Sequence, residues 1–506
     1  MKKVTSVFWI TLAITLAASL WGVLAPKNFE TISGNVKTYI SIHFGWYYLL
    51  LVSIFVLFCL YMIISPFGKI KLGKPGDKPD YSYSTWFAML FSAGMGIGLV
   101  FYGAASPVSH YISTPPTAEA GTTEAIRDSM RTTFFHYGVH AWAIYAVVAL
   151  VLAYFKFRHD KPGLISATLE PLFGEKMKGP IGKTIDVIAV FATIVGVATT
   201  LGFGAAQING GFTYLLGIEK QYWIQLVIIA VVTVLFMLSA YTGLSKGIKY
   251  LSNANMGIAA VLFVAMLIIG PTMYILNSFV DTLGNYVQKL PDESLRISPN
   301  NDEERQWIMD WTVFFWAWWI AWAPFVGIFI ARVSRGRTIR EFLSGVLLVP
   351  SLVSFLWMTT FGISGIQAQK DGADIAKLPD EQALFGVFDQ FPFAVVLSVL
   401  AMMLIATFFI TSADSATFVL GMQTTNGSLN PPKTVKFAWG VSQSTIAAVL
   451  LYTGGLTALQ NALITAALPF SFIMILMVFS LYKALQQDKK ELDQQKNKST
   501  SSSYSA

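Results

Sequence analysis

Residues Phe314–Phe325, with the sequence FFWAWWIAWAPF, establish the class of this protein. They belong to an apolar run near Thr312–Ala331 that contains no charged residue and is close to the ~20 residues that cross a lipid bilayer as a helix. Four of the 14 tryptophans in the chain lie between Trp316 and Trp322. The run predicts a transmembrane helix of unusual aromatic content.

Similar apolar runs recur along the 506 residues, of which 54% are hydrophobic and only 12% charged. A soluble protein of this size carries about twice that charged fraction. The pattern predicts an all-α membrane protein with twelve transmembrane helices. The expected spans lie near Phe8–Leu24, Tyr47–Ile64, Trp86–Ala105, Phe134–Phe155, Ile185–Gly204, Trp223–Ala240, Met256–Ile275, Thr312–Ala331, Phe342–Phe361, Phe393–Ile410, Phe437–Tyr452 and Ala462–Tyr482.

The charges predict how these spans are oriented. When the loops are assigned alternately to two sides, most of the 35 Lys and Arg residues fall on the side that holds both termini. Cytoplasmic loops carry this excess, so residues 1–7 and the polar tail 483–506 are expected in the cytoplasm of a multi-pass cell-membrane protein. The loops also explain the net charge of +7 without a nucleic-acid partner.

The tail is expected to be a short helix that frays into disorder. It either contacts anionic membrane lipid or only solubilises the chain end. The one cysteine, Cys59, lies within a span, which excludes a disulfide inside the chain.

The third span contains three glycines at alternate positions, in Ser92–Gly98. Each glycine costs a helix interior about 1 kcal/mol relative to alanine, so local unwinding is cheap here. Unwound backbone inside a membrane survives where it lines a cavity and presents free carbonyl groups. Close packing of helices on small residues is the alternative.

The eighth span carries an aromatic stripe. Helical periodicity places seven rings within an arc of about 120°: Trp311, Phe315, Trp318, Trp319, Trp322, Phe325 and Phe329. Pro324 is expected to bend or break the helix. Such a stripe serves either packing or a binding site. With no carboxylate among them, ring faces suit a poorly hydrated cation such as a quaternary ammonium group.

Spans four and ten add further candidates. Span four contributes the rings of Tyr137, Trp142 and Tyr145 and two histidines, His136 and His140, that are either structural or proton relays. Span ten carries a polar group near its inner end, composed of Thr407, Thr411, Ser412, Asp414 and Ser415. These hydroxyls either bond to their own helix or, beside unwound carbonyls of span three, suit a hard cation.

Four segments of the chain resemble one known family: GMGIGLVFYGAASP (94–107), FFHYGVHAWAIY (134–145), FWAWWIAWAPFVGIFIARVSRGRTIREF (315–342) and ITSADS (410–415). They are similar to the betaine/carnitine/choline transporter family, and most of all to the sodium-coupled glycine betaine carriers of Gram-positive bacteria. The resemblance implies a leucine-transporter-like inverted repeat of five plus five helices, pairing residues 86–275 with 312–482 after two extra N-terminal helices. It also implies a homotrimer.

The resemblance implies roles for individual residues. Substrate would be bound by the aromatic rings of Tyr137, Trp142, Tyr145, Trp318, Trp319 and Trp322. One sodium ion would be bound by backbone oxygens near Ala93 and Met95 together with Phe408, Thr411 and Ser412. A second sodium site of the family would use Thr193 and Phe325, but Val197 stands where the family has a further threonine hydroxyl.

The resemblance therefore implies import of glycine betaine, driven by Na⁺ as coupling ion and without other cofactors, for osmoprotection. Gly98 stands where choline carriers resembling this chain tend to have an aspartate, which favours a zwitterion. A carnitine or choline carrier driven by exchange or protons is the alternative. From other classes, a cation or ammonium channel would use the stripe as a pore lining, and a membrane enzyme lacks the required metal-ligand or nucleophile–base spacing.

Overall fold

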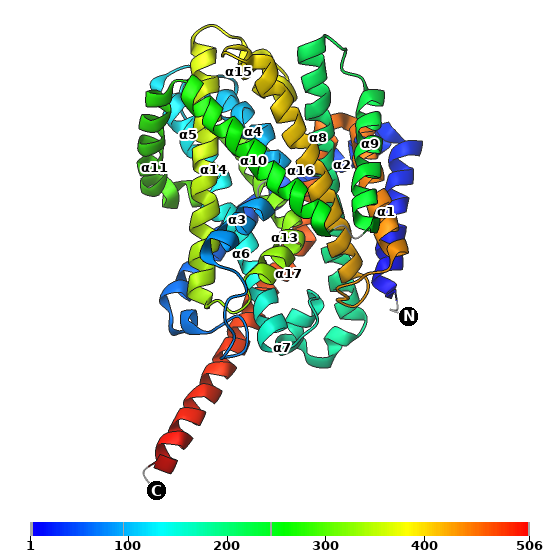
Figure 1. Ribbon diagram of the computed structural model, residues 1–506, viewed down its shortest axis with the longest axis vertical. Helices are drawn as coiled ribbons and strands as arrows, with labels where there is room; N and C mark the ends of the chain where they lie inside the picture. The colour runs from blue at the N-terminus through cyan, green and yellow to red at the C-terminus, as the bar shows by residue number, and fades with distance from the viewer. Residues whose placement is uncertain (1–3, 95, 243–244, 504–506) are drawn as a thin grey trace.

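The computed structural model describes residues 4–94, 96–242 and 245–503. This part of the chain is helical, and its one β-type pairing is an isolated bridge between Lys71 and Thr338. Helices α8, α9 and α14 run roughly upright, α10 crosses the bundle obliquely, and α17 protrudes from its lower end (Figure 1).

The α-helices are α1 (Ser6–Leu24), α2 (Pro26–Ile64), α3 (Tyr83–Gly94), α4 (Ile97–Val108), α5 (Thr123–Tyr137), α6 (Val139–Ala153), α7 (Glu170–Phe173), α8 (Pro180–Leu216), α9 (Tyr222–Thr242), α10 (Ser245–Ile269), α11 (Thr272–Leu295), α12 (Asp302–Ile308), α13 (Phe314–Val333), α14 (Ile339–Lys370), α15 (Asp380–Asp389), α16 (Ala394–Gln423) and α17 (Lys433–Ser503). The short helical turns are η1 (Pro66–Lys69), η2 (Ser109–Ser113), η3 (Tyr154–Arg158), η4 (Ser166–Leu169), η5 (Gly174–Lys178), η6 (Met309–Val313) and η7 (Ile375–Lys377).

Ten helical segments of the described part are long and apolar enough to cross a membrane. The last, Lys433–Lys490, has non-helical backbone angles at Gly454 and Gly455 and so holds two of the expected spans. Helices α3 and α4, each of 12 residues, together hold another. The all-α membrane fold is confirmed and the twelve spans are accommodated, whereas the inverted repeat stays a prediction.

Burial separates central from peripheral spans. Of the 18 most apolar consecutive residues in the segment that contains α13, 94% are buried, whereas only 33% are buried in the corresponding stretch of α1. Large apolar side chains such as Trp9, Leu57 and Val231 lie exposed on α1, α2 and α9, where lipid is the natural solvent. The aromatic helix thus lies in the interior of the bundle, together with span four, whose most apolar part is also 94% buried.

Several predicted boundaries were wrong. Helix α2 begins at Pro26 rather than near Tyr47, and α16 runs to Gln423 rather than ending near Ile410. The seventh span ends at Ile269, because Pro271 precedes a separate helix, α11, which contains Ile275. Hydropathy locates the apolar part of a helix, whereas these helices extend with polar residues beyond it.

The predicted break in span three is present, since α3 ends at Gly94 and Gly96 has extended angles (φ −139°, ψ −156°). A second break, which the sequence analysis missed, divides span four at Gly138 (φ −94°, ψ −143°). Pro324, which is expected to bend or break the helix, does not break it, because α13 continues through that position. Tight packing of α13 on α6, where a Cβ on Gly327 would lie 2.7 Å from Val148, offsets the lost hydrogen bond.

The expectation of a short, fraying tail is also wrong over the described residues. Helix α17 continues to Ser503. Its early tail is held by contacts with the rest of the protein: Lys483 donates to the carbonyl of Pro171 (2.6 Å), and Asp488 pairs with Arg158. Polar composition argues against a buried core, but it does not prevent a helix from extending out of one.

Candidate functional site

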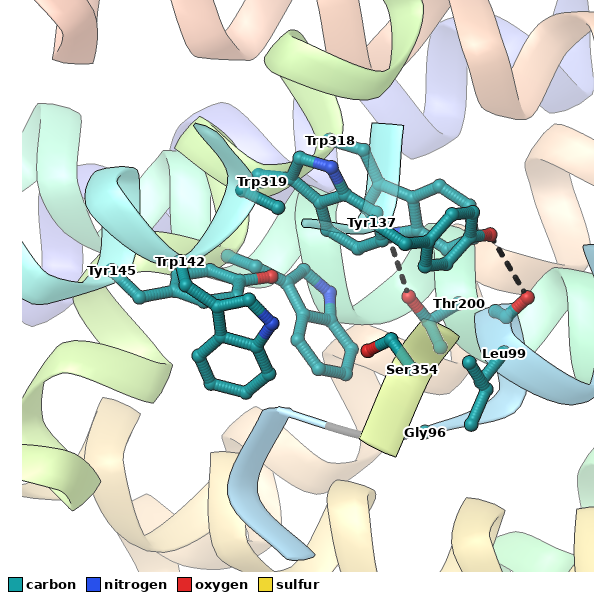
Figure 2. Close-up of a pocket in the computed structure, with 12 residues that line it drawn as sticks. Gly96, Leu99, Tyr137, Trp142, Tyr145, Thr200, Trp318, Trp319 and Ser354 are labelled. Atoms are coloured by element: carbon teal, nitrogen blue, oxygen red, sulfur yellow. Dashed lines mark hydrogen bonds between the residues drawn. The ribbon is translucent and has the colours of Figure 1, made fainter. Parts of the chain in front are cut away.

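A small enclosed space lies between the two broken spans and α13 (Figure 2). Its lining brings together all six aromatic residues that the sequence analysis assigned to substrate, from α5, α6 and α13. The full lining is Gly96, Gly98, Leu99, Tyr137, Ala141, Trp142, Tyr145, Thr200, Trp318, Trp319, Trp322 and Ser354. We call this set the aromatic cage. None of its members carries a charge, so only ring faces and dipoles act on a ligand.

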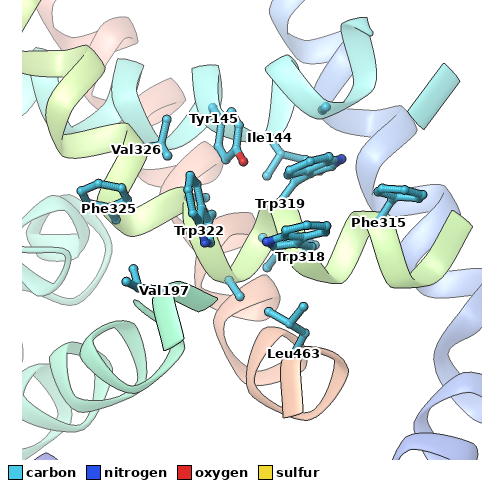
Figure 3. Packing of buried hydrophobic residues seen from close by; sticks show 14 of the residues in the cluster. Ile144, Tyr145, Val197, Phe315, Trp318, Trp319, Trp322, Phe325, Val326 and Leu463 are labelled. Atoms are coloured by element: carbon cyan, nitrogen blue, oxygen red, sulfur yellow. The ribbon is translucent and has the colours of Figure 1, made fainter. Parts of the chain in front are cut away.

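The α13 side of the cage is fixed by its indole N–H groups. Each donates to an oxygen on a neighbouring helix: Trp318 to the hydroxyl of Thr200 (3.2 Å), Trp319 to the carbonyl of His136 (3.0 Å) and Trp322 to the carbonyl of Gly196 (2.9 Å). The rings of Trp318 and Trp319 are stacked at 5.2 Å with an angle of 13°. Figure 3 shows these rings along one face of α13, between Phe315 and Phe325. Their orientation is therefore set by helices on both sides.

The span-four side of the cage meets these rings edge-on. Tyr145 lies 6.2 Å from Trp319 at 71°, and Tyr137 lies 5.4 Å from it at 70°. Trp142 and Tyr145 form a further perpendicular pair at 5.7 Å. The hydroxyl of Tyr137 donates to the carbonyl of Gly98 (3.1 Å), whereas that of Tyr145 is buried with no hydrogen-bond partner in the described part of the chain. Perpendicular rings surround a small volume with negative faces.

The break in span three forms the remaining wall. Gly96 and Gly98 place no side chain between the backbone and the indoles: a Cβ on Gly98 would lie 2.8 Å from Trp318, and one on Gly96 3.5 Å from Trp322. Helix α4 starts here with no side-chain cap among the described residues, and the N–H of Leu99 donates to the carbonyl of Gly96 (3.1 Å). The earlier N–H groups of this first turn point to a place where an anionic group could be bound. The cage thus combines aromatic faces with a helix N-terminus.

The cavity inside the cage has a volume of about 20 Å³. That is room for one water molecule and too little for a trimethylammonium group. The stacked tryptophans and the perpendicular tyrosines occupy the space between the helices. A ligand of that size requires the two sides of the cage to separate.

The described candidate residues for the first sodium ion lie on α3 and α16, neither of which contributes a residue to the lining of the cage. Ala93 is in the last turn of α3, and Met95 lies outside the described residues. Phe408, Thr411 and Ser412 are in the middle of α16, not at its inner end. The hydroxyl of Thr411 bonds to its own helix at the carbonyl of Thr407 (2.9 Å) and accepts from Asn255 (3.1 Å).

The candidate residues for the second sodium ion include a gap. Thr193 is buried on α8 and donates to the carbonyl of Ala189 (2.8 Å). Val197, one turn later, is fully buried, and Figure 3 places it opposite Phe325. Of these two positions one turn apart on α8, only Thr193 carries a hydroxyl.

The two histidines of span four are hydrogen-bonded in the packed interior. His136 bonds to the hydroxyl of Thr312 (3.0 Å), and its ring stacks on Phe315. His140 bonds to Ser294 (2.9 Å) and stacks on Trp316. These contacts favour the structural alternative over the proton relay.

The sequence analysis missed part of the cage lining, namely Leu99, Ala141, Thr200 and Ser354. Thr200 is one turn beyond Gly196 on α8, and Ser354 lies in the middle of α14. A lone hydroxyl in a membrane helix commonly bonds to its own backbone, so no signal in the sequence distinguished these two.

The family model described as BCCT, betaine/carnitine/choline family transporter, matches residues 6–490 of this chain. The chain belongs to this family. It is therefore a multi-span membrane transporter with a small-molecule substrate, and not an enzyme.

Curated relatives extend over the same length. The glycine betaine transporter OpuD of Bacillus subtilis (strain 168) is 60% identical over 97% of this chain and 96% of its own length. The ectoine/hydroxyectoine transporter of Virgibacillus pantothenticus is 43% identical over 97% of this chain and 98% of its own. A glycine betaine transporter of Acinetobacter baylyi is 44% identical over 93% of this chain and 71% of its own.

Proposed function

We propose that this protein imports glycine betaine into the cell by sodium-coupled alternating access, for osmoprotection. The observation that carries the proposal is the aromatic cage beside the N-terminus of α4, which has no side-chain cap among the described residues. The rings would bind the trimethylammonium group, and the N–H groups near Gly96 and Gly98 would bind the carboxylate. The relative that is 60% identical, whose name states glycine betaine, supports the same substrate.

The absence of charge from the cage favours a zwitterion. Glycine betaine brings its own negative charge, whereas choline would leave a desolvated cation with no counter-charge among the lining residues. Carnitine and choline remain the alternative substrates, by exchange or proton coupling. The ectoine/hydroxyectoine relative adds ectoine as a comparator in the test.

Sodium coupling gives the transport its direction. Glycine betaine is neutral overall, so the membrane potential alone does not concentrate it. One Na⁺ moving inward contributes about 2.3 kcal/mol per 100 mV, which corresponds to accumulation of tens-fold, and two would give roughly a thousandfold. We propose one ion beside Thr411 and Ser412 of α16, because Val197 leaves the second site short of a hydroxyl.

Uptake of labelled glycine betaine into proteoliposomes tests the proposal. An inward sodium gradient is compared with a potassium and a proton gradient, with excess unlabelled choline, carnitine or ectoine as competitors. We expect saturable uphill uptake with sodium alone and a Hill coefficient for sodium near one. Uptake driven by protons, or by exchange without sodium, would refute sodium coupling. Stronger competition by ectoine or choline than by unlabelled glycine betaine would refute glycine betaine as the preferred substrate.

A single substitution tests the stoichiometry. In Val197→Thr a hydroxyl replaces a methyl group on the turn after Thr193, which completes the hydroxyl pair of α8. We expect the sodium dependence of uptake to become steeper. Val195→Thr, a buried position on the same helix but off this face, is the control; equal behaviour of the two variants would remove the second site from consideration.

A further inference from the structure

The break in span four leaves backbone N–H groups without a partner in their own helix, and a side chain from another helix binds one of them. Span four divides at Gly138, directly after Tyr137 and four residues before Trp142, so the break lies within the cage-forming stretch. A helix that restarts inside the bundle begins with backbone N–H groups that have no partner in their own helix. Buried and unbonded, such a group destabilises the structure by the cost of its desolvation.

A tyrosine from outside the cage binds one of these groups. The N–H of Val139 donates to the hydroxyl oxygen of Tyr286 on α11 (3.2 Å). The ring of Tyr286 is buried and perpendicular to Phe355 at 5.1 Å, so its hydroxyl is held in place. A Cβ on Gly138 would lie 2.8 Å from that hydroxyl and 2.7 Å from Phe355. Only glycine permits this close approach.

Helix α11 also holds both halves of the broken span. On the α5 side, the buried Arg131 donates to Glu293 (2.9 Å) and Asn285 (3.1 Å). On the α6 side, His140 bonds to Ser294 (2.9 Å). The hydroxyl of Tyr286 lies between these two attachments, at the break itself. Helix α11 therefore spans the joint between α5 and α6.

We infer that Tyr286 is a positioning residue for the aromatic cage: its hydroxyl binds the backbone at the Gly138 break and so sets the angle between α5, which carries Tyr137, and α6, which carries Trp142 and Tyr145. Tyr286 does not line the cavity. The inference rests on the proposed role of the cage in substrate binding. It assigns to α11 the function of holding the substrate site from outside.

The test is Tyr286→Phe, which keeps the ring and its packing and removes only the acceptor. Uptake is measured in proteoliposomes, with hydrogen–deuterium exchange of peptides covering residues 134–145. We expect faster exchange at 139–142 and a KM for glycine betaine raised about three- to tenfold, the range for one neutral hydrogen bond, with kcat within about twofold. Tyr222→Phe, which loses a hydroxyl bonded to the carbonyl of Ala448 (2.9 Å), is the matched control with unchanged KM.

The outcomes separate clearly. Faster exchange with an unchanged KM would overturn the positioning role, and unchanged exchange would overturn the bond itself. If the wild-type protein carries another quaternary ammonium solute, the proposed substrate fails, but the ratio of variant to wild-type KM for that solute still decides the inference. Should Tyr286→Phe not reach the membrane, Ser294→Ala loosens the neighbouring attachment; an unchanged KM in that variant would overturn the inference.

Discussion

The two sides of the aromatic cage differ in how firmly they are held. On α13, three indole N–H groups each donate to another helix, and two of the rings are stacked on one another. On span four, the backbone is broken at Gly138, so the positions of its rings depend on the joint that α11 holds, and the buried hydroxyl of Tyr145 has no hydrogen-bond partner among the described residues. We call α13 the rigid face of the cage and span four, which is broken at Gly138, the hinged face. This arrangement suits a site whose present cavity is too small for the ligand and must widen to admit it. The difference suggests that α13 defines the shape of the site and that span four closes it.

The largest expected effect comes from removing a ring of the rigid face. Trp319→Ala deletes a face that both Tyr137 and Tyr145 meet edge-on. A desolvated cation–π contact is worth about 2 kcal/mol, so apparent affinity should fall at least about 30-fold. Uptake kinetics in proteoliposomes measure this. Trp46→Ala is the control, since that ring is 57% exposed at the periphery. An equal loss of affinity in both variants would contradict a role of the rigid face in binding the substrate.

A smaller loss should follow from pushing the rigid face out of place. In Gly98→Ala, the new methyl group would lie 2.8 Å from the indole of Trp318, which is stacked and unable to retreat without moving Trp319. We expect about a tenfold rise in KM, consistent with the typical 1–3 kcal/mol cost of overpacking. The control is Gly96→Ala, in which the same added methyl group would lie 3.5 Å from Trp322, an ordinary van der Waals distance. Similar KM values for the two variants would contradict a rigid Trp318.

Loosening one anchor should have a still smaller effect. Thr200→Val keeps the shape of the side chain but removes the acceptor for the indole N–H of Trp318. A buried donor without a partner costs about 1–3 kcal/mol, part of which the indole recovers by shifting, so we expect a three- to fivefold rise in KM. Thr184→Val on the same helix, at an exposed hydroxyl, should leave KM unchanged. A normal KM in Thr200→Val would mean that stacking alone holds the ring.

The smallest effect is expected on the hinged face. Tyr145→Phe removes a hydroxyl that forms no hydrogen bond in this conformation and leaves the ring. Affinity measured by competition uptake should change less than about twofold. Tyr137→Phe, which loses a bond to the carbonyl of Gly98, should have the larger effect of the two. The reverse order would reveal that the hydroxyl of Tyr145 contacts the substrate and that span four does more than close the site.

Much of this site was predictable because its signals are local. The aromatic stripe follows from the spacing of tryptophans on one helix, and the break in span three follows from three glycines in seven residues. The break in span four has no such signal, since a single glycine in FFHYGVHAW is common in membrane helices. It is stabilised by Tyr286, 147 residues away from Val139, and the two meet only after folding.

The sequence by itself determined the class of protein, the approximate positions of the spans and the aromatic stripe of α13, and the family resemblance implied the six rings of the cage. Hydropathy and helical periodicity are properties of short segments, and they hold wherever the segment is placed. Only the tertiary structure decided that α13 continues through Pro324, that Thr200 and Ser354 join the cage, and that α11 holds the joint at Gly138. Each of these depends on packing or hydrogen bonds between helices, which exist only once distant segments lie side by side.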